Sequence, residues 1–337
     1  MIAATWPRDD RARARLLLMD RRSGALEDRV ASELPRLVES GDLLVVNDAA
    51  TLPASLMGTA NGTPIELRLL DASDGLWRAV AFGAGSWRTP TERRPSPPQL
   101  ARGAQLSFGG LCATVEAVLS TSSRLLSVRF AQTAEVFWSE LYRIGKPVQY
   151  SYLSGELRLW HVQNSYAARP WAAEAPSAGF VLSARVLAEL RQHGVRVAAL
   201  THAAGLSSSG DEALDAALPL AERYEIPAST VAAIAAARAN GGRIIAVGTS
   251  VVRALETHAL ERGGELRAGA GQSELRIGPG FALRVVDGLL SGIHDPAASH
   301  YALLQAFASR EHLDAAHAAA ERWGYLEHEF GDVCLLL

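Results

Sequence analysis

Two histidines in this sequence lie where they could move a proton. His202 follows the apolar run 195–200, and His294 lies in the short segment 293–296. An imidazole changes its charge near neutral pH and therefore suits acid or base chemistry. We predict that the run 195–200 is a strand, and α/β sheets bind ligands at the carboxyl ends of their strands. A histidine at such a position serves either catalysis or structure, and both interpretations stay open.

The turn Gly248-Thr249-Ser250 is a second candidate site. It joins the β-branched run 244–247 to a stretch with apolar residues at helical spacing, which predicts a buried strand followed by a helix. Glycine permits the sharp turn, and either hydroxyl can cap the helix, whose free N–H groups attract an anion. The turn could therefore bind an anionic ligand, although most turns of this kind in α/β proteins bind nothing.

Two polar residues end another apolar run, 42–46. Asn47 and Asp48 follow this run directly, where a predicted buried strand reaches its carboxyl end. Their side chains could hydrogen-bond a ligand there, or they could form an Asx turn with their own backbone. The sequence does not decide between these two roles.

The elements that would position these residues follow an α/β pattern. Gly194 and the pair Gly241-Gly242 close two of the helical stretches, as glycine commonly does at helix ends. The predicted strands are 15–20, 25–30, 42–46, 195–200, 244–247, 282–286 and 333–337, and the predicted helices are 136–144, 183–193, 229–240, 303–307 and 312–322.

Between residues 58 and 130 the period of the apolar residues changes to two. Asn61-Gly62 and Asp74-Gly75, both strong hairpin signals, separate such segments. We therefore predict an antiparallel β-barrel domain over residues 58–149, inserted into an α/β main domain made of residues 1–57 and 150–337. The proline-rich stretch 89–98 is predicted to be a solvated loop, with Arg93 and Arg94 exposed at its centre rather than bound to phosphate.

The composition limits the classes of function. The 337 residues are 48% hydrophobic and 20% charged, as in soluble globular proteins, and the net charge of -3 gives no global attraction to nucleic acid. Cys112 and Cys334 have no disulfide or zinc-ligand spacing, which favours free thiols in a reducing compartment. No stretch approaches the roughly 20 apolar residues of a membrane span. We expect a cytoplasmic protein without a membrane partner.

Seven stretches of sequence follow one another in a characteristic order. They are RLLLMDRRSG, GDLLVVNDAATLPASL, APSAGF, RYEIP, GGRIIAVGTSVVRALE, VVDGLLSGIH and FGDVCLL. This order resembles the S-adenosylmethionine:tRNA ribosyltransferase-isomerase family of queuosine biosynthesis. The resemblance implies an α/β main domain interrupted by a β-barrel, in agreement with the change of period.

The resemblance also implies a reaction. The ribosyl moiety of S-adenosylmethionine is transferred and isomerised onto a 7-aminomethyl-7-deazaguanine base in tRNA, giving epoxyqueuosine with loss of adenine and methionine. S-adenosylmethionine is then a co-substrate, and no metal is implied. Such a reaction needs a base for the ribose methylene beside the sulfonium and a proton donor for adenine. His202, His294 and Asp332 are expected to fill these roles.

Substrate contacts are expected from the matching stretches. Gly248 and Thr249, at the helix start, and Arg253 are expected to hold the methionine carboxylate of the donor. Asn47 and Asp48 are expected to bond the purine or ribose. The remaining expected contacts are Ser177, Ala178, Gly179 and Tyr224.

Some positions depart from the family pattern. Ala49-Ala50-Thr51 and Ala54-Ser55 lack the arginines that the family has there, and 150–157 lacks its basic segment. Fewer cationic groups mean weaker phosphate binding, so tRNA is a possible partner rather than a required one. Two alternatives stay open: an enzyme of the same fold acting on a small molecule or nucleoside, and a non-catalytic nucleotide- or RNA-binding scaffold. The oligomeric state is also open, with a monomer favoured.

Overall fold

The computed structural model describes residues 1–296 and 299–337, and its centre is a nine-stranded mixed sheet. The order of strands in the sheet is β16 (Gly269–Ser273), β14 (Glu222–Ile226), β13 (Arg196–His202), β4 (Leu43–Asn47), β15 (Ile244–Val247), β17 (Gly288–Gly292), β19 (Val333–Leu336), β2 (Arg15–Met19) and β3 (Leu26–Val30). The four strands β13, β4, β15 and β17 are parallel. Their carboxyl ends therefore meet at one edge of the sheet.

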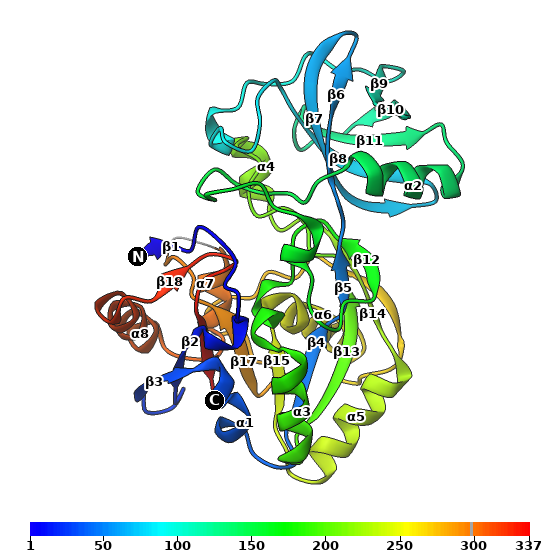
Figure 1. Ribbon diagram of the computed structural model, residues 1–337. Helices are drawn as coiled ribbons and strands as arrows, with labels where there is room; N and C mark the ends of the chain where they lie inside the picture. The colour runs from blue at the N-terminus through cyan, green and yellow to red at the C-terminus, as the bar shows by residue number, and fades with distance from the viewer. Residues whose placement is uncertain (297–298) are drawn as a thin grey trace.

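Helices cover both faces of this sheet (Figure 1). Alternate residues of β4 point to opposite faces, so Leu43 and Val45 enter one core while Leu44 and Val46 enter the other. This explains why the strand is apolar throughout. The first core is shared with helices α5 (Ala228–Ala239), α6 (Thr249–Glu261), α7 (Ser299–Leu304) and α8 (Arg310–Trp323), and the second with α1 (Leu34–Leu37) and α3 (Ala184–Gln192).

A closed antiparallel barrel forms the second part of the molecule (Figure 1). Its strands are β6 (Ser55–Ala60), β7 (Thr63–Ser73), β8 (Leu76–Phe82), β9 (Gln105–Phe108), β10 (Leu111–Val118) and β11 (Leu125–Phe130). Both predicted hairpin turns are confirmed, because Asn61, Gly62, Asp74 and Gly75 all have positive φ. Helix α2 (Ala134–Ile144) packs on the barrel through Phe137 and Leu141. The predicted fold class, an α/β domain with an inserted β-barrel, is confirmed.

The chain enters the barrel from the carboxyl edge of the sheet. Strand β5 (Ala49–Thr51) continues from β4 towards β6 and pairs with β12 (Arg169–Ala172), on which the chain returns. Ala173, Leu206 and Leu214 of the main domain belong to the hydrophobic core of the barrel, the last from α4 (Glu212–Ala217). The barrel is therefore packed against the loops that leave the strand ends.

One predicted strand is wrong. Residues 282–286 do not form a strand. The strand of the sheet in this region is β17, which starts at Gly288. The buried Glu256 of α6 explains the difference, because its carboxylate accepts the backbone N–H groups of Arg284, Val285 and Val286 at 2.8 to 3.0 Å. These donors are no longer available to a neighbouring strand.

The chain ends are joined by a small sheet of β1 (Ile2–Ala3) and β18 (Leu326–Glu327).

The prediction that Arg94 is exposed is also wrong, although Arg93 is exposed as expected. Arg94 is 3% exposed and donates to Glu66 at 2.5 Å, while Arg68 donates to the other oxygen of Glu66 at 2.7 Å. Burial alone raises the pKa of Glu66, but the two guanidinium groups outweigh it and hold that pKa below its usual value. The barrel therefore contains a charged Arg-Glu-Arg cluster.

Among residues 1–296 and 299–337, no helix has the length and apolar character needed to cross a membrane.

We expect Glu66→Gln to destabilise the protein by about 3 to 5 kcal/mol, because it leaves two buried guanidinium groups without a counter-charge. Glu116→Gln is the control, since Glu116 pairs with the half-exposed Arg129 and its loss should cost about 0.5 kcal/mol or less. Urea unfolding of both variants measures the difference. Equal unfolding midpoints would show that the buried cluster does not stabilise the barrel.

Candidate active site

The carboxyl edge of the sheet gathers most of the predicted site residues. Asn47 and His202 end β4 and β13, Gly248 follows β15, and His294 comes shortly after β17. The antiparallel strand β19 begins at the same edge, so Asp332 directly precedes it there. Residues from five separate stretches of sequence thus meet where an α/β sheet normally binds its ligand.

His202 is completely buried at this edge. Its Nε2 lies 3.6 Å from the Oε2 of Glu222, and in the described part of the chain neither ring nitrogen has a hydrogen-bond partner. Burial lowers the pKa of His202 to about 4; Glu222 opposes this change and Arg253 adds to it. The imidazole is therefore neutral at neutral pH, as a base requires.

His294 lies with a second histidine at the same edge. Its Nε2 is 2.8 Å from the hydroxyl of Ser291, and its ring stacks on that of His300 with centroids 5.0 Å apart. Burial, with His300 and His328 nearby, lowers the pKa of His294 to about 3. Burial also lowers the pKa of His300, which is influenced by Glu222 and Arg253. His300 therefore connects the surroundings of His294 to those of His202.

Asn47 and Asp48 both bind groups of the protein. The Oδ1 of Asn47 accepts the backbone N–H groups of His202 and Ala49 at 2.9 and 3.0 Å, and its Nδ2 donates to the carbonyl of His202 at 2.9 Å. Asp48 accepts a hydrogen bond from the hydroxyl of Thr201 at 2.6 Å. Asn47 thus fixes the backbone of His202, and direct substrate contacts by these two residues remain a prediction.

The turn after β15 has the predicted shape, but its N-cap residue is a glycine rather than Thr249 or Ser250. Gly248 is the N-cap of α6 with φ of 95°, a conformation that favours glycine. Within residues 1–296 and 299–337 no side chain caps the helix, so the expected capping by Thr249 or Ser250 is wrong. Ser250 instead receives a long hydrogen bond of 3.4 Å from Asn47. In this described part of the chain the start of α6 has no side-chain acceptor, which suits it to an anionic ligand.

Ser177 and Ala178 line a hollow together with Arg8, Arg11 and Asp332. A Cβ placed on Gly248 would lie 3.6 Å from the Cβ of Ala178. Gly179 packs against Tyr166, whose hydroxyl would be 1.9 Å from a Cβ at position 179, so no larger residue fits there. The structure thus brings the stretch 177–179 and the turn at Gly248 together, as the predicted site requires.

Asp332 also lines this hollow, but its carboxylate is already bound. Its Oδ1 accepts from the guanidinium of Arg8 at 2.7 Å and from the backbone N–H of Arg15 at 2.8 Å, and its Oδ2 accepts from the backbone of Leu326 at 2.8 Å. The carboxylate thereby joins the N-terminal segment to β2 and β18. A role in proton transfer remains a prediction for Asp332, and its present contacts are structural.

Arg253 and Tyr224 have different surroundings. Arg253 is buried, forms an ion pair with Glu222 and donates to the carbonyls of Leu275 and Ser273 at 3.1 Å. Tyr224 is fully buried in the core, where its ring meets His258 with centroids 5.7 Å apart. The structure therefore brings Arg253 to His202 but places Tyr224 in the packing beneath the site.

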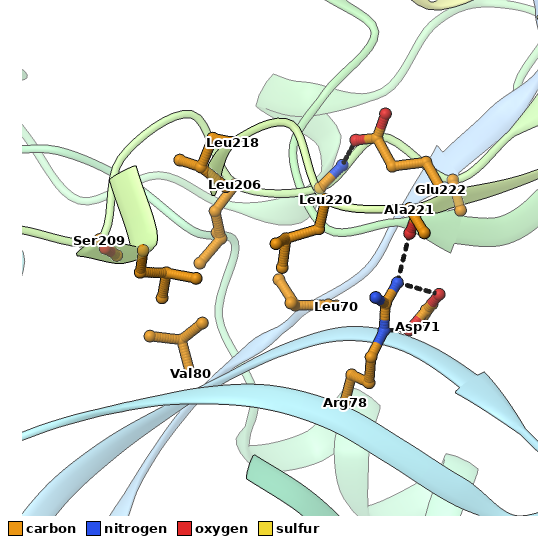
Figure 2. Close-up of a pocket in the computed structure, with 13 residues that line it drawn as sticks. Leu70, Asp71, Arg78, Val80, Leu206, Ser209, Leu218, Leu220, Ala221 and Glu222 are labelled. Atoms are coloured by element: carbon orange, nitrogen blue, oxygen red, sulfur yellow. Dashed lines mark hydrogen bonds and ion pairs between the residues drawn. The ribbon is translucent and has the colours of Figure 1, made fainter. Parts of the chain in front are cut away.

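A second hollow lies between the barrel and the main domain. Figure 2 shows Leu70 and Val80 of the barrel facing the leucines at positions 206, 218 and 220. Arg78 pairs with Asp71 at 2.7 Å and donates to the carbonyl of Ala221. Glu222 lines the same hollow, so this hollow extends to the surroundings of His202.

Sequence reasoning missed Glu222 and His300. Glu222 begins an antiparallel strand, and only the pairing of β14 with β13 brings it beside His202. His300 belongs to a short helix and has no recognisable ligand spacing to His294. The position of Glu222 one residue before the matched stretch RYEIP was the available signal. Over the described ranges, no three His, Cys, Asp or Glu side chains gather in a way that could hold a metal ion.

Comparison with known proteins gives one consistent result. The family profile described as "Queuosine biosynthesis protein" matches residues 1–336. The S-adenosylmethionine:tRNA ribosyltransferase-isomerase of Moorella thermoacetica is 34% identical, with 99% of this chain and 96% of the relative covered. The enzyme of the same name from Acidithiobacillus ferrooxidans is 36% identical, with 99% and 94% covered.

A solved structure is similar in fold. It is the S-adenosylmethionine tRNA ribosyltransferase of Thermotoga maritima, with a TM-score of 0.55, 24% identity, and 100% of this chain and 96% of that chain covered.

We expect the stability of the folded protein to fall as the pH is lowered from 6.5 to 4. The unfolded chain takes up a proton on His202 near its usual pKa of 6.5, whereas the folded chain does so only at about 4. The difference corresponds to about 3 kcal/mol lost across this window. Urea unfolding at a series of pH values should show a shallower decline for His202→Gln. The exposed His193→Gln is the control, and equal slopes for the two variants would contradict a neutral buried His202.

Proposed function

The chain belongs to the queuosine biosynthesis protein family, and on that premise we propose that it is an S-adenosylmethionine:tRNA ribosyltransferase-isomerase. It transfers and isomerises the ribosyl moiety of S-adenosylmethionine onto a 7-aminomethyl-7-deazaguanine base in tRNA, giving epoxyqueuosine. The observation that carries this proposal is the neutral, buried His202, linked through Asn47 to the start of α6, within a chain that matches the family along its length. A tRNA substrate would place the enzyme in the cytoplasm, and residues from one chain suffice for the site, so a monomer is the simplest assembly.

The donor is proposed to bind along the carboxyl edge. Its methionine carboxylate meets the first N–H groups of α6 at Gly248 and Thr249, where no side chain competes. Arg253, in the first turns of α6, adds positive charge near this helix start. Its ion pair with Glu222 reduces the positive charge that the donor carboxylate meets. Ala178 lies beside Gly248, so Ser177, Ala178 and Gly179 are proposed to contact the donor there, and Asp48 its purine or ribose. Asn47 holds the strand ends in place, and Tyr224 supports them from the core.

The two histidines are proposed to share the proton transfers. A sulfonium acidifies the adjacent ribose methylene, so a neutral imidazole can remove one of its protons. His202 is assigned this role because it is neutral and has free ring nitrogens. His294, whose Nε2 bonds Ser291, is assigned to the departure of adenine. Asp332 is proposed to support the site by binding the backbone N–H groups of Arg15 and Leu326.

The alternatives receive less support. Relatives of about this length carry the tRNA enzyme's name over nearly the whole chain, which favours a tRNA acceptor over a small molecule. Among the described residues the ring nitrogens of His202, like those of His258, have no hydrogen-bond partner, which costs stability. At the carboxyl edge of the sheet this cost favours a functional His202 over a scaffold without activity.

We expect the purified protein to release adenine from S-adenosylmethionine only when tRNA carrying 7-aminomethyl-7-deazaguanine is present. His202→Gln and His294→Gln should each lower the turnover number about 10² to 10⁴-fold, the usual contribution of a general acid or base. His193→Gln, at the surface, should leave it unchanged. Chromatographic detection of adenine measures the reaction.

The other outcomes of this assay identify the alternatives. Adenine release without tRNA would favour a small acceptor, and binding of S-adenosylmethionine without release would favour a non-catalytic scaffold. Absence of any affinity for S-adenosylmethionine would contradict the proposed function.

We expect Gly248→Ala to raise the KM for S-adenosylmethionine by about tenfold or more, because a strained turn displaces N–H groups whose bonds to an anion are worth about 1.5 to 3 kcal/mol. Gly241→Ala is the matched control, since Gly241 also has positive φ, of 74°, but lies at the opposite end of β15. Both variants should lose similar stability. An unchanged KM for Gly248→Ala would remove the helix start from the donor site.

A further inference from the structure

Glu222 joins three elements at the carboxyl edge of the sheet. It begins β14, its Oε1 accepts the backbone N–H of Gly205 at 2.6 Å, and its Oε2 accepts from the guanidinium of Arg253 on α6. The residue is 9% exposed. Gly205 thus binds one oxygen, and the other oxygen contacts Arg253 and lies 3.6 Å from the Nε2 of His202.

The imidazole of His202 needs such a neighbour. A neutral imidazole carries one N–H donor and one lone-pair acceptor, and buried groups of this kind are normally hydrogen-bonded. Within the described residues both ring nitrogens lack a partner, and Nε2 lies 3.6 Å from Oε2 of Glu222. That separation is longer than a hydrogen bond, yet catalytic hydrogen bonds are often long before substrate binds. A shift of less than about 1 Å would form it.

We propose that Glu222 is the positioning residue for His202: it accepts the Nε2 proton and thereby leaves Nδ1 as the lone pair that acts as base. This inference rests on the proposed function. In the step concerned, a C–H bond of the ribose methylene breaks and a proton is transferred to Nδ1. The electron pair stays on the carbon beside the sulfonium, and the imidazolium that forms is stabilised by the carboxylate of Glu222.

The charges around His202 agree with this arrangement. Glu222 from β14 favours the imidazolium, and Arg253 from α6 opposes it. His300 from α7 is influenced by both of these groups. Arg253 also donates to two carbonyls, so it does not depend on Glu222 alone for its hydrogen bonds. Glu222 is therefore the acidic group that lies beside the Nε2 of His202, which has no hydrogen-bond partner among the described residues.

Glu222→Gln tests this inference through a pH profile. Glutamine still offers an oxygen to Gly205 or Arg253, but it carries no charge. We expect kcat/KM to fall at least about 10²-fold and the acid limb of its pH profile to move to lower pH, because losing the carboxylate lowers the pKa of His202. Glu222→Asp keeps the charge and should retain the position of the limb.

Glu225→Gln is the matched control. Glu225 lies on the same strand and pairs with Arg169 at 2.5 Å, on a more exposed part of β14. Its loss removes the same charge from the same element and should leave the acid limb in place. If Glu222→Gln lowers activity but does not move the limb, the role of Glu222 is structural only and the inference is wrong.

A second measurement does not depend on turnover. Nitrogen chemical shifts of ¹⁵N-labelled histidine report which ring nitrogen carries the proton, and His202→Gln identifies the signal among the 9 histidines. We expect the Nε2–H form of His202 in the unaltered protein and a loss of this preference in Glu222→Gln. The same tautomer in both proteins would overturn the inference even if the protein shows no transferase activity, whereas the expected shift without turnover would contradict only the proposed function.

Discussion

The parallel pairing of β4 with β13 and β15 is the constraint on which the candidate site depends. Because these strands run in the same direction, their last residues, and the loops that follow, meet at one edge. Asn47 reinforces this alignment by exchanging hydrogen bonds with the backbone of His202 across the strand ends. A shift of register by one residue would turn His202 to the opposite face of the sheet. The position of His202 is therefore determined by the sheet rather than by a loop.

Buried charge is the second constraint. The edge holds Glu222, Arg253 and three imidazoles in surroundings that disfavour isolated charges. The structure resolves this by pairing the acid with the guanidinium and leaving the histidines neutral. The carboxylate of Glu222 favours a protonated His202, whereas burial and the guanidinium of Arg253 oppose it. The paired carboxylate therefore offsets only part of the cost of an imidazolium at this position.

Much of the fold followed from patterns in the sequence, while the site followed only in part. The period-two segments, one Asn-Gly turn and one Asp-Gly turn were sufficient to predict the barrel. Local geometry determines both the alternation of side chains and the conformation of the turns. The prediction of a strand at 282–286 was wrong because the carboxylate of Glu256, remote in sequence, accepts backbone N–H groups of this segment. The predicted exposure of Arg94 was wrong for a similar reason, because Arg94 lies in the loop after β8 and its partner Glu66 lies on β7. The position of His202 could be predicted from its strand, whereas Glu222 and His300 reach the same edge only through long-range packing.

The barrel and the candidate site are connected through the residues on either side of Glu222. Ala221 accepts a hydrogen bond from Arg78 of β8, and the guanidinium of Arg223 donates to the carbonyl of Ala72 on β7 at 3.3 Å. The start of β14 is thus attached to one hairpin of the barrel immediately before and immediately after the residue that faces His202. These two bonds fix the start of β14 relative to the barrel, and Glu222 lies between them. Since Glu222 is 3.6 Å from His202, the inserted domain contributes to the geometry around His202 although none of its described residues lies at the carboxyl edge of the sheet.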